Sequence, residues 1–179
     1  ADPKAMHPGG DDYLIRAADR QDAGTIRLLL SKGLDPHRAD GNGLTALSAS
    51  IGCNGGEVTR LLIEAGSDVN RAPWNQGIVR NGPIESTGVT PLMDAASCGE
   101  LDTVKALLKA GAKINARDDR GMSPLMIAIA MDRANPEVVR VLLAAGADLK
   151  PADYRGDTAL DWARRFGNPA IIAMLQKTG

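Results

Sequence analysis

Apolar residues recur along this chain at helical spacing in short stretches, most of which end at a glycine. The clearest unit, from Gly88 to Arg120, predicts two short helices followed by an extended loop. Its first helix should begin at Thr90, whose hydroxyl can cap a free backbone N–H, with Pro91 at the first helical position. A second helix runs roughly from Leu101 to Lys109, and Gly111 should end it in a left-handed conformation. Helices of about nine residues are marginal alone, so the unit requires neighbours.

The same helix-pair pattern recurs along the chain with a period near that of known helical repeats. After residues 1–11, which we interpret as a flexible lead, residues 12–179 form a single predicted domain. Its approximate units are 12–39, 40–72, 85–117, 118–152 and 153–179, and the glycines that end their second helices include Gly33, Gly66, Gly111 and Gly146. This spacing indicates an all-α repeat array rather than one globular core.

Two motifs within these units identify the family that the chain resembles. An opening Thr-Pro-Leu motif at 90–92 has variants at 45–47, 123–125 and 158–160, and a closing motif starts at 66, 111 and 146. By these motifs, residues 12–176 resemble ankyrin repeats. The resemblance implies an all-α solenoid of about five stacked helix-turn-helix units with projecting hairpin-like loops. At the fourth position of the opening motif, where the family usually has histidine, this chain has Ser48, Met93, Met126 and Asp161. At the two methionines we expect thioether packing to replace some of the polar bonding between repeats.

One inter-repeat segment is about twice as long as its later equivalent, which places an insertion at residues 73–84 within the turn-rich segment 73–86. This insertion offers four candidate partner-binding residues: Trp74, Ile78, Val79 and Arg80. Tryptophan and arginine are enriched at binding hot spots, although Trp74 could instead pack back onto the solenoid. A loss of partner affinity in Trp74→Ala would favour the hot-spot interpretation, and unchanged affinity would count against it.

The ankyrin resemblance also implies that a partner binds the projecting loops and the concave face. The matching loop positions supply the other candidate partner-binding residues: Asn42, Leu44, Asp119, Arg120, Met122, Tyr154 and Arg155. Trp162 lies within the last opening helix, so we expect it to pack inside the terminal repeat rather than to bind a partner.

Composition and chemistry narrow the function. Aromatic residues make up 3% of the chain and the net charge is -1, without a long Lys or Arg run, which argues against a general nucleic-acid binder. The longest apolar run is too short to span a bilayer, so no membrane insertion is expected. His7 lies in the lead and His37 in a loop, and no nucleophile, metal-ligand or phosphate-binding motif is present. We therefore predict no catalytic, cofactor or metal site and no enzymatic activity.

The two cysteines, Cys53 and Cys98, occupy the same place in adjacent repeats. Packed helices lie about 8–10 Å apart, whereas disulfide Cα atoms lie about 4.4–6.8 Å apart. A bridge therefore requires the repeats to approach locally, and both a disulfide and two free thiols stay open. A bridge would favour an oxidising compartment. Ala1 is either a mature end left by signal-peptide removal or a remnant of recombinant expression.

These patterns predict a non-enzymatic module, monomeric alone, that binds a protein partner through its concave loop face and the 73–86 insertion. The specific hypothesis is an inhibitor or protective, immunity-like partner of an enzyme. We favour the bacterial periplasm for its location, and the cytoplasm is the alternative. The alternative function is a structural scaffold or homo-oligomerising repeat protein whose insertion stabilises the array.

Overall fold

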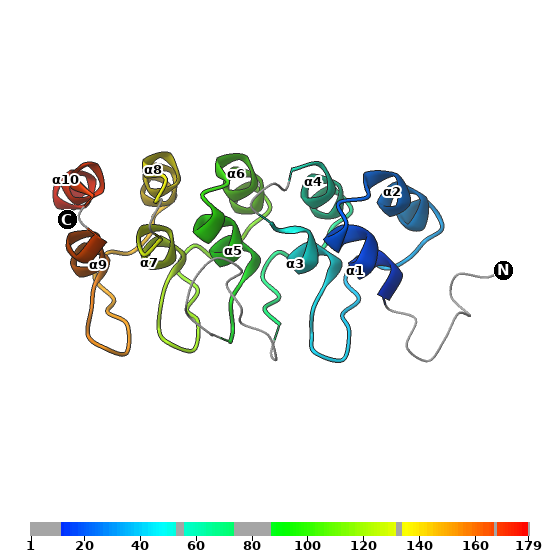
Figure 1. Ribbon diagram of the computed structural model, residues 1–179, viewed down its shortest axis with the longest axis horizontal. Coiled ribbons are helices and arrows are strands. Elements are labelled where there is room, and N and C mark those ends of the chain that lie inside the picture. Colours follow the sequence, from blue (N-terminus) through cyan, green and yellow to red (C-terminus); the bar gives the residue numbers. More distant parts are fainter. Residues whose placement is uncertain (1–11, 53–55, 74–86, 132–133, 167, 179) are drawn as a thin grey trace.

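The computed structural model describes residues 12–52, 56–73, 87–131, 134–166 and 168–178. Within these residues the chain forms five pairs of helices that stand in a single row (Figure 1). The pairs are α1 (Asp12–Asp19) with α2 (Ala23–Ser31), α3 (Ala46–Ser50) with α4 (Glu57–Glu64), α5 (Pro91–Cys98) with α6 (Leu101–Lys109), α7 (Pro124–Ile129) with α8 (Pro136–Ala144), and α9 (Ala159–Phe166) with α10 (Pro169–Thr178).

Figure 1 places the first helix of each pair in one layer, the second helices in another, and the connecting loops as projections beyond the first layer. This arrangement confirms the predicted all-α solenoid. The repeat limits and the 73–84 insertion stay predictions, because residues 1–11 and 74–86 lie outside the described residues. The projecting loops carry isolated antiparallel bridges, Ala39 with Thr45 and Ala152 with Thr158, which give them their hairpin form.

The predicted start and end signals act where the sequence places them. The Thr90 side chain accepts a hydrogen bond from the N–H of Met93 at the start of α5, and Gly99 caps the other end with a φ of 70°. Met93 is fully buried, as thioether packing requires, and its sulfur also accepts from the Thr90 N–H at 3.4 Å. We expected the Met93 thioether only to pack in the core, but it also takes part in the cap of α5.

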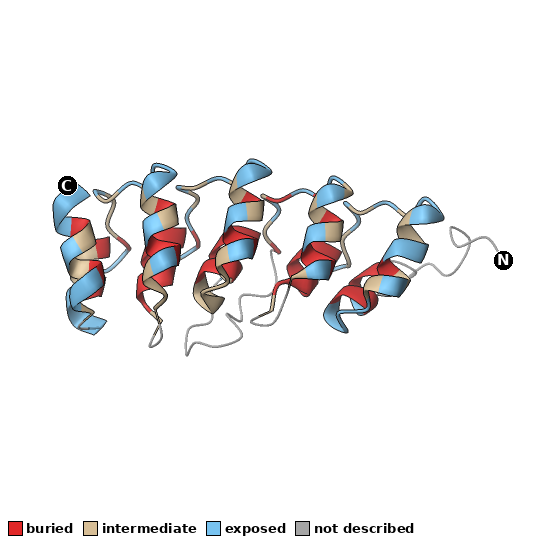
Figure 2. Cartoon of the chain, turned by 90° about the horizontal axis from the view of Figure 1, so that it is seen from above, coloured by how far each residue is buried: buried red, intermediate tan, exposed pale blue. Residues whose placement is uncertain are grey.

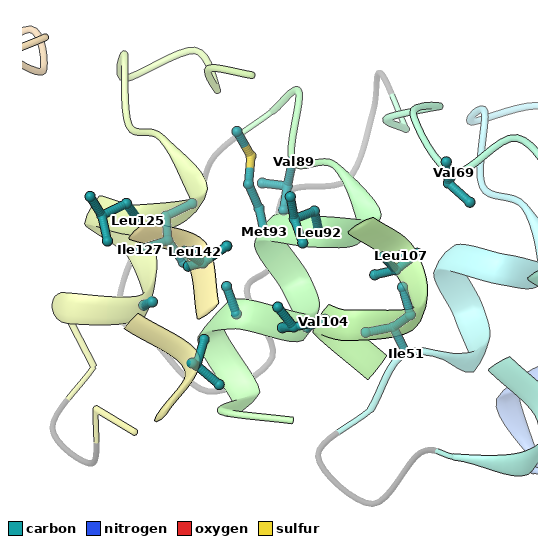
Figure 3. Packing of buried hydrophobic residues seen from close by; sticks show 14 of the residues in the cluster. Ile51, Val69, Val89, Leu92, Met93, Val104, Leu107, Leu125, Ile127 and Leu142 are labelled. Atoms are coloured by element: carbon teal, nitrogen blue, oxygen red, sulfur yellow. The ribbon is translucent and has the colours of Figure 1, made fainter. Parts of the chain in front are cut away.

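One continuous apolar core runs through the row of repeats, between the two helix layers. Every residue of α3 and α7 is buried, so these central first helices are enclosed by their neighbours. Figure 2, which looks onto the second helices, shows exposed positions on their outer side and buried positions towards the first layer. Figure 3 shows the core around α5 and α6, where Leu107 lies on the side of Ile51 in the preceding repeat, and Leu125 and Leu142 of the following repeat lie on the other side. The core therefore fixes the positions from which the loops project.

Candidate protein-binding surface

Three projecting loops share one construction, which is centred on an aspartate at the first position: Asp40, Asp118 and Asp153. In each loop, one carboxylate oxygen of the aspartate accepts hydrogen bonds from the backbone N–H groups two and four residues later. The distances are 2.8 and 2.9 Å for Asp40, 3.0 and 2.8 Å for Asp118, and 2.8 and 3.0 Å for Asp153. The side chain thus holds the tight turn in the way that an Asx turn does.

The glycine three residues after each aspartate completes this turn, since it adopts a positive φ that other residues rarely take. The φ values are 79°, 76° and 85° at Gly43, Gly121 and Gly156. Each glycine N–H also donates to the carbonyl of the loop aspartate, at 2.9–3.0 Å. The same hydrogen bonds and the same glycine conformation therefore give the three loops a similar backbone turn.

The second carboxylate oxygen of the aspartate differs between loops. Oδ2 of Asp118 accepts from Nε and Nη2 of Arg120 at 3.1 and 2.7 Å, and the Asp118 side chain is fully buried. Oδ2 of Asp153 accepts instead from the indole N–H of Trp162 at 3.0 Å. Arg120 is consequently held within its own loop and is half-buried.

Hydrogen bonds also join neighbouring loops to one another. The Asp119 N–H donates to the Thr87 carbonyl at 3.1 Å, and the Thr87 hydroxyl donates to the Asp119 carboxylate at 2.8 Å. Tyr154 lies in the following loop, and its N–H donates to the Arg120 carbonyl at 3.0 Å. The loops of the last three repeats thus form one connected row rather than independent tips.

The structure divides the predicted loop residues by their exposure. Asp119, Tyr154 and Arg155 are exposed at the loop tips, as a binding role requires. Asn42 and Arg120 are half-buried. Those predicted in the insertion, Trp74, Ile78, Val79 and Arg80, lie outside the described residues. The binding roles of all these residues stay predictions.

Two predicted loop residues face the core. Met122 is only 2% exposed, so its prediction as a surface residue for partner binding is wrong in placement. Its N–H and C=O pair with Asp118 across the turn, at 2.8 and 3.1 Å, and the side chain enters the core. Leu44, at the same position of its own loop, is half-buried and packs against that core. An apolar residue stands at this position in two of the three loops, with Asp157 in the third, and this partial recurrence was the signal that could have revealed burial.

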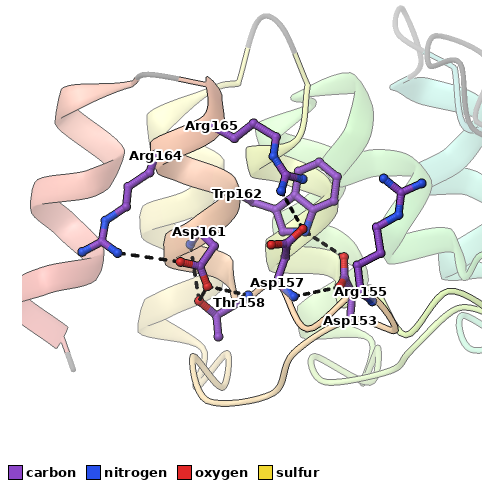
Figure 4. A network of polar contacts seen from close by, with 8 residues as sticks. All are labelled: Asp153, Arg155, Asp157, Thr158, Asp161, Trp162, Arg164 and Arg165. Atoms are coloured by element: carbon purple, nitrogen blue, oxygen red, sulfur yellow. Dashed lines mark hydrogen bonds and ion pairs between the residues drawn. The ribbon is translucent and has the colours of Figure 1, made fainter.

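Trp162 packs inside the terminal repeat, as predicted from its position in α9. Its side chain is 7% exposed, and its ring stacks on Phe166 with centroids 5.8 Å apart. The guanidinium of Arg165 lies over the ring at 4.8 Å and pairs with Asp157 at 2.7 Å (Figure 4). Arg165 was not among the predicted residues, and its contact with the ring follows from its spacing of three residues from Trp162 on the helix.

Asp161 supplies a second polar contact in the same repeat. Its carboxylate accepts from the Thr158 N–H at 3.0 Å and from the Thr158 hydroxyl at 2.6 Å (Figure 4). These hydrogen bonds favour the charged form and hold the pKa of Asp161 below its ordinary value of 3.8. The acid thus caps the start of α9 at the motif position where the family usually has histidine.

Cys98, at the end of α5, is bonded in a disulfide. The sequence contains two cysteines, and the other, Cys53, lies outside the described residues. The Cys53–Cys98 pairing therefore stays a prediction.

Within the described part of the chain, no group of three or more His, Cys, Asp or Glu side chains is arranged to hold a metal ion. His37 lies exposed in its loop. Among the helices that the structure describes, none combines the length and the apolar character needed to cross a bilayer.

Comparison with known proteins agrees with this architecture. A family model described as ankyrin repeats (3 copies) matches residues 14–118 and 115–179. Cyclin-dependent kinase 4 inhibitor B of Bos taurus is 33% identical over 140 residues, which cover 78% of this chain and 96% of that protein. Protein phosphatase 1 regulatory subunit 27 of Mus musculus is 38% identical over 78 residues, which cover 44% of this chain and 49% of that protein.

Another relative is much longer. Rabankyrin-5 of Homo sapiens is 36% identical over 127 residues, which cover 69% of this chain but only 10% of that protein. The shared part is therefore the repeat array itself. The family match spans nearly all the described repeats, and the chain belongs to the ankyrin-repeat family.

Proposed function

We propose that this protein is a non-enzymatic interaction module that binds one protein partner through its projecting loops and the 73–86 insertion. In the specific form of this proposal, it inhibits or protects an enzyme. The family supports the coarser statement, because repeat solenoids present extended surfaces to other macromolecules. The names of two similar proteins, a kinase inhibitor and a phosphatase regulatory subunit, support a regulatory form of it.

The observation that carries the proposal is the connected row of loops at 87–89, 117–123 and 152–158. Its tips expose Asp119, Tyr154 and Arg155, while buried aspartates and inter-loop hydrogen bonds fix the backbone beneath them. A surface that is already ordered loses less conformational entropy when a partner binds. Tyrosine and arginine are also among the residues that most often dominate binding energy.

Affinity capture from the native source tests the proposal. The immobilised full chain should retain a specific protein, and purified samples of the two should then bind in isothermal titration calorimetry. Tyr154→Ala should weaken this binding by about 1–2 kcal/mol, the range expected when an interface aromatic is truncated. Arg140→Ala, on the outer face of α8, is the matched control and should leave the affinity unchanged. Equal affinity for all three chains would place the interface elsewhere.

The insertion needs its own test. Removal of residues 77–83 should abolish partner binding and leave the helical circular dichroism largely intact, while Trp74→Ala should weaken binding. Unfolding of the shortened chain would instead support the scaffold alternative, in which the insertion stabilises the array. Once a partner is known, a change in its enzymatic rate on addition of this protein decides between inhibition and simple binding.

The location in a bacterial periplasm belongs to the same proposal. The disulfide at Cys98 supports it, since disulfides persist in oxidising compartments. Thiol alkylation of cells before and after reduction, followed by mass measurement, should show that the cysteines are oxidised in the native source. Free thiols in freshly lysed cells would contradict this location.

A further inference from the structure

The junction of the last two projecting loops presents an aromatic ring beside a guanidinium group. The Tyr154 side chain is 79% exposed. A Cβ added to Gly121 would lie 3.0 Å from Nη2 of Arg117 and 3.0 Å from Cδ1 of the Tyr154 ring. The guanidinium and the ring therefore lie side by side against one glycine, which only a residue without a side chain could permit.

Both groups are held in place by the loops below them. The Arg117 guanidinium donates to the Ala152 carbonyl, and the Tyr154 N–H donates to the Arg120 carbonyl. Arg155, the next residue along, is also exposed, and Figure 4 shows its side chain extending away from the polar contacts of Asp153 and Asp157. The junction thus carries two arginines and one tyrosine on a backbone that hydrogen bonds hold in place.

The charge of this junction is not balanced within the described loops. Asp118 and Asp153 are buried, and their carboxylates are occupied by backbone N–H groups, Arg120 and the Trp162 indole. Asp119 is exposed, but its carboxylate accepts from the Thr87 hydroxyl. Among the described residues, no carboxylate pairs with the guanidinium of Arg117 or Arg155. Asp157 pairs with Arg165, so among the described residues both exposed guanidinium groups lie without a paired carboxylate.

We propose that Arg117, Tyr154 and Arg155 form a subsite for an acidic segment of the protein partner. Carboxylates of that segment would pair with the guanidinium groups, and an adjoining side chain would pack on the tyrosine ring. Arginine suits this role because its planar group binds carboxylates at two points. The inference rests on the proposed protein-binding function and names the chemistry of the partner at this site. The net charge of -1 and the short basic cluster favour a peptide over a nucleic acid.

Nuclear magnetic resonance of the full ¹⁵N-labelled chain can test the subsite directly, since it detects weak binding residue by residue. The probe is a blocked ten-residue peptide of alternating Glu and Ala. It should shift the amide signals of Gly121, Tyr154 and Arg155 in a saturable way, and added salt should weaken the effect. A peptide of alternating Lys and Ala should leave these signals in place. An absence of shifts with the Glu peptide, or equal shifts with the Lys peptide, would overturn the proposal.

Matched variants sharpen the test. Arg155→Glu should raise the dissociation constant for the Glu peptide about tenfold or more, because it replaces attraction by repulsion. Arg140→Glu makes the same change on the outer face of α8 and should leave that constant unchanged. Tyr154→Ala should raise it by a smaller factor. Circular dichroism confirms that each variant is folded, and equal effects of the Arg155 and Arg140 variants would remove the subsite.

A ten-nucleotide single-stranded DNA is the competing polyanion. If it binds the same residues more tightly than the Glu peptide, the junction is a general anion surface and the proposal fails. The capture experiment separates this result from the proposed function. A partner retained equally by the native chain and by Arg155→Glu would leave protein binding intact and reject this subsite. Binding of the Glu peptide without any captured partner would support the subsite and count against the proposed function.

Discussion

The later repeats and the first repeat are joined differently along the edge where each second helix ends. Asn115 lies four residues after Gly111, and its amide bridges to the next repeat. It donates to the Gly146 carbonyl at 3.3 Å and accepts from the Asp148 N–H at 2.9 Å. Asn70 makes the equivalent pair of bonds at 3.1 and 2.8 Å. Each of these junctions is therefore held by a side chain that acts as donor and acceptor together.

His37 stands at the same position in the first repeat, four residues after Gly33. It is exposed, and within the described residues its side chain makes no hydrogen bond. At this junction the Ser67 hydroxyl donates to the Pro36 carbonyl at 3.4 Å, and nearer the helices the Gln21 amide donates to the Ser50 carbonyl at 2.7 Å. The surface pair of Arg27 and Glu57, at 2.6 Å, adds little because both side chains are more than half exposed.

The difference teaches which part of a repeat fixes it to its neighbour. The apolar core continues through both kinds of junction, so it is the contact that all the stacked repeats share. The amide at the end of the second helix adds a directional contact to the backbone of the next repeat. The first repeat, which lacks that contact, should therefore be the less firmly attached one.

The largest change expected in this comparison comes from the core. Leu107 is fully buried in α6, whereas Leu28 of α2 is 57% exposed. Leu107→Ala should lower the free energy of unfolding by about 2–5 kcal/mol, because it leaves a cavity and removes buried apolar surface. Leu28→Ala should change it by about 0.5 kcal/mol or less. Urea unfolding followed by circular dichroism measures both, and a near-zero effect at Leu107 would contradict the repeat alignment.

Loss of one bridging amide should have the next largest effect. Asn115→Ala removes two hydrogen bonds to the following repeat and should cost about 1–2 kcal/mol in urea unfolding. His37→Ala, at the equivalent position, removes no hydrogen bond to a described residue and should be nearly neutral. If the two variants lose the same stability, the amide bridge does not distinguish the junctions.

The opposite change should repair the first junction. His37→Asn places an amide opposite the Gly66 carbonyl and the Asp68 N–H, the groups equivalent to those that Asn70 bridges one repeat later. It should raise the free energy of unfolding by about 0.5–1 kcal/mol. Hydrogen exchange should also slow in α2 if the first repeat becomes more firmly attached. Unchanged exchange together with unchanged stability would show that the amide cannot form the bridge there.

The fold was predictable because its signals are local and repeated. Thr90, Pro91 and Gly111 mark helix ends through their own backbone preferences, and the apolar spacing marks the buried faces. One repeat therefore served as a guide to the others. The same reasoning placed Trp162 in the terminal core correctly.

The surface was less predictable, because it depends on which residues of different repeats become neighbours. The Arg117 bond to Ala152 and the Tyr154 bond to Arg120 join residues far apart in the sequence, and no local motif specifies them. Met122 was misplaced for a related reason. Its loop position suggested exposure, but the hydrogen bonds of the turn direct its side chain into the core.

The smallest expected effect concerns the motif position that holds Met93 in α5 and Asp161 in α9. Both side chains accept a hydrogen bond from the backbone at the helix start, but only the carboxylate can be protonated. Because the Thr158 hydrogen bonds lower the pKa of Asp161 on folding, its contribution to stability is complete above the unfolded value and is lost as the pH falls through the folded one. Asp161→Asn should therefore lessen the loss of stability as the pH falls below the ordinary carboxyl value of 3.8.

Glu64→Gln on the exposed face of α4 is the matched control for this change, because no described residue donates a hydrogen bond to Glu64. Urea midpoints compared at neutral pH and at a pH below 3.8 give the pH dependence of each chain. The Asp161 variant should show a smaller difference between the two conditions than the native chain does, and the Glu64 variant should retain the native difference. If both variants flatten the dependence equally, loss of a surface charge explains it. The cap at α9 would then be equivalent to the uncharged one at α5, and the acid at this position would give the terminal repeat no pH sensitivity of its own.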